Sequence, residues 1–295
     1  MVQLAGGEDC EICDPVGMVL PPVAVQLPTP AVSVAGNSLL LTGLRTIPAN
    51  LSPGNEFGLE SIGGDKGDTA RLDSLQEILT LDTGAKLVTA AGSILQKGFD
   101  NAKQVRAALG GAKPLQTVFP NTSLGSQMKQ IAQIVSIRSQ IGATRQVFFC
   151  SQGGYDHHSE LLTGQDRRFG ELGPAMVALY RATEELGVAP QVTTFTASEF
   201  GRTFNPSSTE GSDHAWGSHH FVMGGGVKGG DMYGRFPTLE LQGPDDAADR
   251  GTWIPTTSLD QYGATLASWF GVGASDLSTV FPNLVNFSTK SLNFV

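Results

Sequence analysis

Between residues 124 and 135, apolar side chains recur at steps of three or four along an otherwise polar stretch. This spacing predicts a helix with one buried face. We expect Asn121 or Ser123 to cap its start and Gly142 to mark where the helical segment stops. The apolar positions are Leu124, Met128, Ile131 and Val135.

Short apolar runs alternate with these helical patterns. Residues 145–151 form a nearly continuous apolar run, and residues 191–198 are rich in β-branched and aromatic side chains, so both are predicted strands. A second helical pattern over residues 172–186 separates them and ends at Gly187. The order helix, strand, helix, strand is typical of βαβ units. We therefore predict an α/β fold with a mostly parallel central sheet flanked by helices.

The rest of the chain is organised around this unit. We predict an extended Pro-rich segment over residues 1–30, poorly ordered or packed at an edge, followed by a single α/β domain over residues 31–295. Residues 31–43 are predicted as two short strands around a Gly-Asn turn, residues 72–109 as helices broken near 82–84, and residues 219–230 as a strand running into a Gly turn. Residues 258–272 are predicted as a helix that begins with a Ser258/Gln261 capping box. One face of that helix is formed by Leu259, Tyr262, Leu266 and Trp269.

Composition narrows the possible partners. The chain has a formal net charge of −9 and no run of Lys or Arg, which argues against a nucleic-acid partner or an anionic membrane surface. No apolar run is long enough to span a bilayer, and no export signal is visible.

The cysteines do not indicate a site. Cys10 and Cys13 form a lone CxxC, which we interpret as an incidental pair or a local disulfide in preference to a redox or metal site. Cys150 is interpreted as a packed thiol.

The histidines are confined to two short clusters. All five lie between residues 157 and 220, in "GGYDHHSE" and "GSDHAWGSHH", and each cluster contains an aspartate. The first cluster directly follows one predicted strand, "EFGR" (199–202) follows the other, and the second cluster comes about a dozen residues later. Ligands of open α/β sheets lie beyond the carboxyl ends of the strands. We therefore expect the three segments to meet at one edge of the sheet.

Carboxylates and imidazoles together are ligands for Zn, Mn or another divalent ion. Their number fits a two-metal site, or one metal with general acid and base groups. Arg202 is the candidate for holding an anionic group, with a buried ion pair to Glu199 or Asp213 as the alternative. His157 is interpreted as an exposed loop residue and His220 as a strand residue that packs in the core. The candidate metal ligands are Asp156, His158, Glu199, Asp213, His214 and His219.

At these residues the sequence resembles the DUF1501 family, a bacterial family of unassigned activity related in fold to alkaline phosphatases and sulfatases. The matching strings are "RQVFFCSQGGYDHHSE", "TASEFGRTFN", "GSDHAWGSHHFVMGGGVKGGDMYGRFP" and "IPTTSLDQYGATLASWFGV", over roughly residues 120–295, with a weaker match in "AVSVAGNSLLLTG".

The resemblance implies an alkaline-phosphatase-like sandwich with metals at the strand ends. Asp156 and His158 would share one metal, Glu199 would take the place of an aspartate, and His214 or His219 would be the late metal-binding histidine. It also implies export by a twin-arginine leader and a periplasmic or secreted location.

The sequence departs from the family pattern in its N-terminal half, most of which we expect to be lacking. "LAGGED" (4–9) echoes a strand-end motif of that half, but no nucleophile can be identified, and His157 stands where the family usually has Thr. The "SEF" at 198–200 lacks the Asp-His pair of phosphatases and sulfatases, which puts a second metal in question.

Two functions are compatible with these observations. One is a metal-dependent hydrolase of small phosphate or sulfate esters, with Zn, or else Mn, Ca or Mg. The alternative is a truncated or degenerate non-catalytic member that binds a ligand or envelope partner through a metal-stabilised loop site. A third possibility is a metal that only stabilises the fold.

Overall fold

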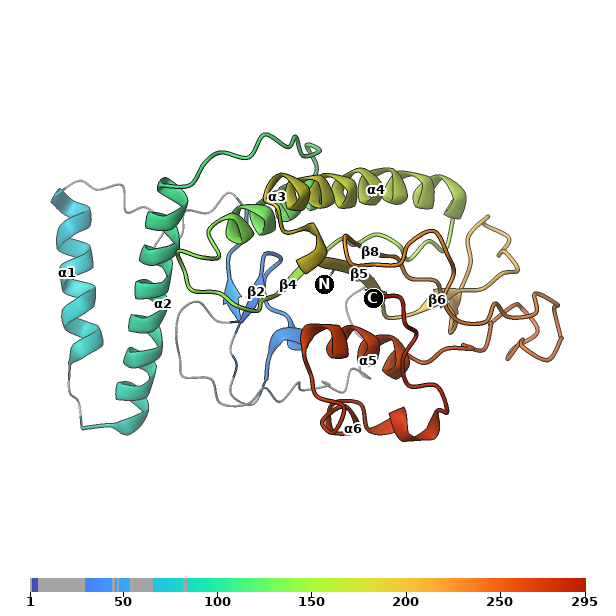
Figure 1. Cartoon of the computed structure of the whole chain (residues 1–295). Helices are drawn as coiled ribbons and strands as arrows, with labels where there is room; N and C mark the ends of the chain where they lie inside the picture. The colour runs from blue at the N-terminus through green and yellow to red at the C-terminus, as the bar shows by residue number, and fades with distance from the viewer. Residues whose placement is uncertain (1, 5–29, 44–45, 47, 54–65, 82–83) are drawn as a thin grey trace.

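A six-stranded sheet with helices on both sides forms the centre of the molecule (Figure 1). The computed structural model describes residues 2–4, 30–43, 46, 48–53, 66–81 and 84–295. The strand order is β3-β2-β4-β1-β5-β8. The first five strands in this order run parallel to one another, and β8 is antiparallel to β5. The predicted α/β class with mainly parallel strands is confirmed. The strands are β1 (Val2–Leu4), β2 (Ala31–Ser33), β3 (Ala49–Asn50), β4 (Val147–Ser151), β5 (Thr193–Ser198) and β8 (Val222–Gly224).

The first strand lies inside the sheet. Val2 is paired with Cys150 of β4 on one side and with Thr196 of β5 on the other. The expectation that this end of the chain packs at an edge is therefore wrong for residues 2–4, and β4 and β5 are not direct neighbours. A strand of three residues carries too little pattern to be recognised in sequence. "LAGGED" beyond Leu4 lies outside the described residues, as does the CxxC pair.

The main core lies between the sheet and two long helices, α3 and α4, which run along the same side of it (Figure 1). Cys150 of β4 faces this core, whereas its neighbour Phe149 belongs to a small cluster on the other face, as the alternation of a strand requires. α5 covers that other face near β5 and β8, where the hydroxyl of Tyr262 donates to the carbonyl of Thr196 at 3.1 Å. The helices are α1 (Lys66–Thr80), α2 (Lys86–Gly110), α3 (Ser123–Ser136), α4 (Leu161–Glu185), α5 (Leu259–Phe270) and α6 (Leu277–Val280), with 3-10 turns η1 (Leu39–Leu41), η2 (Ala189–Gln191) and η3 (Pro282–Asn286).

The strongly periodic segments match the predictions. In α3 all four predicted apolar positions are buried, and the capping box at Ser258 and Gln261 is present at the start of α5. The cap of α3 is Thr122, whose hydroxyl accepts from the N–H of Gly125 at 3.0 Å, rather than either neighbour we expected.

Other details differ from the predictions. The second strand expected within 31–43 is the 3-10 turn η1, where Leu39 and Leu40 face solvent. α4 begins at Leu161, well before its periodic part. Its first turn lies against the loops: the N–H of Leu161 donates to the carbonyl of Glu210, and the ring of His157 lies against Gly164. At the ends of α5, Leu259 is 65 % exposed and Trp269 is 36 % exposed, so of the four predicted positions only Tyr262 and Leu266 are buried.

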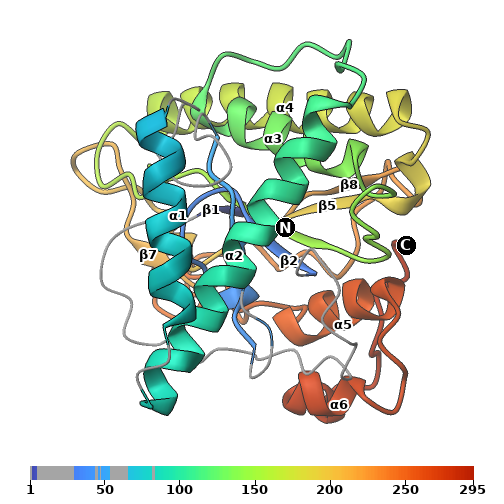
Figure 2. The same ribbon diagram turned by 90° about the vertical axis from the view of Figure 1, so that its left-hand side faces the viewer.

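α1 and α2 form an antiparallel pair at the opposite end of the molecule from β6 (Figures 1 and 2). Among the described residues, no helix combines the length and apolar character that crossing a membrane requires.

Candidate metal centre

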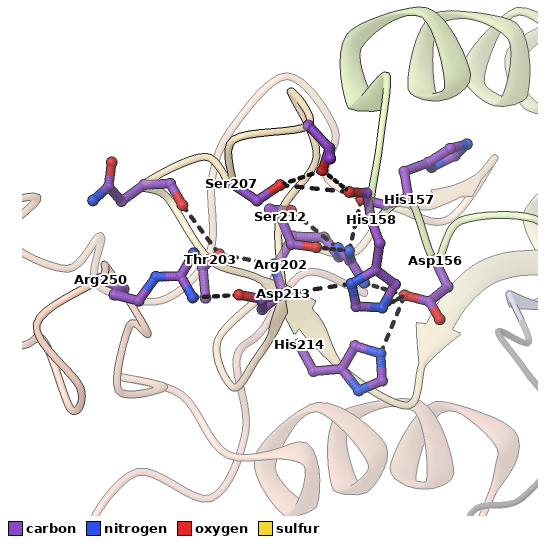
Figure 3. Close-up of polar contacts among 12 residues, drawn as sticks. Asp156, His157, His158, Arg202, Thr203, Ser207, Ser212, Asp213, His214 and Arg250 are labelled. Atoms are coloured by element: carbon purple, nitrogen blue, oxygen red, sulfur yellow. Dashed lines mark hydrogen bonds and ion pairs between the residues drawn. The ribbon is translucent and has the colours of Figure 1, made fainter.

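Two loops from the carboxyl ends of β4 and β5 meet to form the candidate site (Figure 3). The first loop runs from the end of β4 to the start of α4. The second extends from a two-stranded ribbon, β6 (Gly201–Arg202) and β7 (His214–Ala215), in which Arg202 is paired with His214. A bridge between Ser159 and Glu210 joins the two loops. The predicted meeting of these segments is confirmed.

Three side chains from these loops present ligand atoms to one point. Asp156 Oδ1 lies 3.0 Å from His158 Nε2 and 3.1 Å from His214 Nε2. One ligand atom from each residue lies within 4.8 Å of the other two, and all three residues are exposed. Ligand atoms of a tetrahedral zinc site are about 3.3 Å apart when each lies at its usual distance from the ion. The spacing and the chemistry of this trio therefore fit one divalent ion.

Arg202 holds one member of the trio, Asp156, in place. Its side chain is only 14 % exposed, and it pairs with the Asp156 carboxylate. Nε donates to the hydroxyl of Ser212 at 3.1 Å, and one terminal nitrogen donates to the carbonyls of His157, at 2.7 Å, and Ser212. The predicted ion pair of Arg202 is thus made with Asp156 rather than with Glu199 or Asp213. Each nitrogen of the guanidinium already contacts the protein.

Asp213 supports His158. Its carboxylate Oδ1 lies 3.4 Å from His158 Nδ1, while Nε2 of the same ring faces Asp156. The other carboxylate oxygen of Asp213 pairs with Arg250. A carboxylate behind a metal-binding imidazole fixes the orientation of the ring and raises its basicity. This position fits a supporting role, and Asp213 is not among the three converging ligands.

The other imidazole is positioned by an aromatic ring. His214 is stacked on Phe200, with ring centroids 4.0 Å apart and planes 16° apart. The guanidinium of Arg202 lies 5.8 Å from the centroid of the same Phe200 ring. Phe200 therefore restricts the rotamers of His214 and of Arg202, the arginine that pairs with Asp156.

Charges around Asp156 keep its carboxylate ionised. Partial burial of the group acts to raise its pKa, but the hydrogen bond and charge of Arg202 and the two nearby imidazoles outweigh that, so the pKa of Asp156 is below its usual value. The hydrogen bond and charge of Arg250 lower the pKa of Asp213 in the same way, against a smaller effect of burial. Both carboxylates are anionic at neutral pH, as a metal ligand and its support must be.

Glycines let the two loops approach closely. A Cβ atom on Gly211, in the second loop, would lie 2.0 Å from the backbone carbon of His158 in the first. Within the second segment itself, a Cβ atom on Gly201 would lie 2.1 Å from the carbonyl oxygen of Gly217. The loops are further joined by hydrogen bonds to the carbonyl of His158, including one at 2.6 Å from the hydroxyl of Thr209. The backbone between the ligands is thus fixed by contacts that no side chain larger than hydrogen would permit.

The remaining candidates lie apart from the trio. Glu199 follows β5 directly and is half-buried, and His219 is exposed with its ring 5.1 Å from that of Phe236. Their roles as ligands, and a second metal, stay predictions. His157 is half-buried rather than exposed, because its ring lies against Gly164 in the first turn of α4. His220 packs on Tyr262, and burial, with a smaller effect of His219, lowers its pKa.

Among the residues that shape the site, sequence reasoning missed Gly211 and Thr209, which join the loops, and also Phe200, Ser212 and Arg250. Phe200 could have been found, because it lies within "SEFGR" between two candidate residues. Ser212 and Arg250 act through contacts with residues 10 and 37 positions away along the chain, and no local pattern signals such contacts.

No curated protein and no solved structure matches the chain at the significance required. The model of a family described as "Protein of unknown function (DUF1501)" matches residues 41–249, well over half of the 295 residues, including both loops of the trio. The chain therefore belongs to the DUF1501 family.

Proposed function

We propose that this protein binds one divalent metal ion, zinc in the first instance, through Asp156, His158 and His214 and hydrolyses small phosphate or sulfate esters there. The observation that carries the proposal is the convergence of one carboxylate and two imidazoles at 3.0–3.1 Å on an exposed surface. Structural zinc sites use four protein ligands, whereas catalytic sites use three and leave a position for water or substrate.

The residues around the trio suit this chemistry. A divalent ion there would polarise an ester oxygen and make a water molecule more acidic. Asp213 would keep His158 oriented, and Arg202 would hold Asp156, so that neither ligand needs to reorganise during turnover. Mn, Mg or Ca would be poorer fits than Zn, because they prefer oxygen ligands and two of the three ligands here are imidazoles.

The ester class rests on the family resemblance. An alkaline-phosphatase-like arrangement, with metals beyond the carboxyl ends of parallel strands, is consistent with the sheet and with the position of the trio. A periplasmic or secreted location belongs to the same proposal.

Metal analysis tests the site itself. Protein purified without chelators should contain about one equivalent of zinc, and His158→Ala and His214→Ala should each lose it. His219→Ala is the matched control, because His219 is an exposed histidine of the same loop region outside the trio. Less than half an equivalent of any divalent ion in the wild type, or equal loss in all three variants, would rule out the assigned site.

A non-catalytic, metal-stabilised binding site is the second candidate. The pairing of Arg202 within the protein favours it, because a guanidinium held this way is less available to a substrate anion. Turnover of aryl phosphate or aryl sulfate that disappears in His158→Ala and persists in His219→Ala would exclude this candidate. Metal binding without turnover of either ester would support it.

A further inference from the structure

The helices α1 and α2 form a layer on the outside of the molecule, which Figure 2 shows from its outer side. Val105, near the end of α2, belongs to the main core, and Ala108 and Leu109 pack against it. α1 packs on α2, and within the described part of the chain no residue of α1 belongs to a hydrophobic cluster. One end of α2 therefore anchors the pair, and α1 lies outside the cores.

A close contact at a glycine fixes how the two helices lie against each other. A Cβ atom on Gly92 of α2 would lie 2.7 Å from the carbonyl oxygen of Leu79 in α1. Because the helices are antiparallel, positions counted equally far from Leu79 and Gly92 in opposite directions lie at the same level. Ile78 and Leu95 therefore lie within about one helical turn of the same level.

Large aliphatic side chains on both helices face solvent, with exposed fractions from 41 % to 67 %. Together they present on the order of 400 Å² of apolar surface, a size that on a soluble protein marks an interaction site. A standard interface buries about 800 Å² on each partner, a little over half of it apolar, so this surface supplies most of the apolar area that a dimer needs. The side chains are Leu72 and Ile78 of α1, Leu81 directly after it, and Val88 and Leu95 of α2.

The charges of the two helices are opposite in sign. α1 has three acidic and two basic residues, whereas α2 has one acidic and four basic residues. Asp73 and Glu77 of α1 and Lys86 and Lys103 of α2 are exposed, and none of the four has an ion-pair partner among the described residues. A surface with both signs side by side is complementary to a second copy of itself, turned so that α1 meets α2. An anionic lipid surface is a poorer fit, because it would repel the acidic α1.

We propose that the outer face of the α1–α2 pair is the interface of a symmetric dimer of this chain, in which α1 of one copy packs on α2 of the other. A twofold axis parallel to the helices keeps each residue at its own level, so Ile78 meets Leu95 of the second copy, and Leu81 meets Val88. The four helices bury these apolar side chains between the copies and leave the opposite charges at the rim. The interface lies at the opposite end of the molecule from β6 and does not depend on the metal or the activity proposed there (Figure 1).

Sedimentation equilibrium of the full chain tests the proposal. The mass should rise from that of one 31.0 kDa chain to that of two, with a Kd on the order of 10 µM. Ile78→Gln combined with Leu95→Gln should raise the Kd at least about a hundredfold, because each substitution removes an apolar contact twice in a twofold dimer. Val177→Gln changes an aliphatic residue of α4 that is 43 % exposed and lies outside the pair, so it should leave the Kd unchanged. A single-chain mass at about 100 µM, or a dimer that the double substitution leaves intact, would overturn the proposal.

Charge reversal tests the arrangement of the helices. Asp73→Lys combined with Glu77→Lys makes α1 basic like α2, so it should weaken the dimer about tenfold at low salt and much less at about 1 M salt, where the charges are screened. Asp166→Lys combined with Glu184→Lys makes the same change of charge on exposed positions of α4 and should leave the dimer as it is. An unchanged or tighter dimer after reversal on α1 would refute the packing of α1 on α2.

Two further measurements exclude other roles of the same side chains. Well below the Kd, the Ile78→Gln/Leu95→Gln variant should melt within about 2 °C of the wild type, because exposed side chains contribute little to the stability of one copy. Melting several degrees lower would show that these side chains pack within their own chain and would overturn the proposal. The wild type should also stay in solution when vesicles of phosphatidylcholine and phosphatidylglycerol are sedimented. Binding to the vesicles that disappears in the double variant would assign the face to lipid instead.

Discussion

Replacing Gly211 by alanine would test whether close contact between the two loops sets the geometry of the trio. The added Cβ would lie 2.0 Å from the backbone carbon of His158, 2.1 Å from its oxygen and 2.4 Å from the nitrogen of Ser159. All three are backbone atoms between a metal ligand and the start of α4, so a rotamer change cannot relieve the contact.

The size of the effect follows from these distances. Carbon atoms in contact lie about 3.5 Å or more apart, so the two loops must separate by about 1.5 Å. Metal–ligand distances tolerate only about 0.2 Å. His158 and His214 lie on opposite sides of the altered contact, and both cannot keep their positions. We expect zinc affinity to fall by about 10- to 100-fold, as when the support of a ligand is removed, and stability to fall by about 1–3 kcal/mol from overpacking.

Zinc affinity is measured by competition with a chelating dye, and stability by urea unfolding. Gly170→Ala is the matched control, because Gly170 lies within α4 and an added Cβ there has no heavy atom within 4 Å. This control should keep its zinc affinity and be slightly more stable, since alanine is the better helix former. Zinc affinity of Gly211→Ala within twofold of the wild type would refute the reasoning.

Three further predictions concern the fold. Burial raises the pKa of the Cys150 thiol to about 11. In a variant with Cys10→Ser and Cys13→Ser, a thiol reagent at pH 8 should therefore label Cys150 only after the protein unfolds. Labelling of the folded protein as fast as a small free thiol would contradict this. Hydrogen bonds from the loop before α3 lower the pKa of Glu185 in the folded protein. The ionised carboxylate therefore stabilises the fold at any pH above the pKa that Glu185 has in the unfolded chain. This contribution is lost as the pH falls through the lower pKa of the folded protein. Glu185→Gln should therefore be less stable than the wild type at pH 7 and equal to it near pH 2 by urea unfolding, and a constant difference would refute this linkage. Ser258→Ala removes half of the capping box and should lower stability by about 0.5–2 kcal/mol in thermal unfolding, whereas an unchanged melting temperature would show that α5 does not depend on its cap.

Much of the fold can be predicted from the sequence, because its signals are local. The four apolar positions of α3, the apolar run of β4 and the capping box of α5 each lie within about a dozen residues, and the structure contains each element where the pattern places it. The meeting of the two polar loops could also be predicted, since parallel strands bring their carboxyl ends to one edge.

Tertiary structure alone decided which residues of the six-member candidate set form the trio. Asp156, His158 and His214 converge because Gly211 and Thr209 bind the second loop to the first, and Arg202 turns inward to hold Asp156. Such contacts join positions more than forty residues apart, so no local pattern encodes them. β1 could not be predicted for the same reason, because its three residues form a strand only by pairing with β4 and β5, which lie far away along the chain.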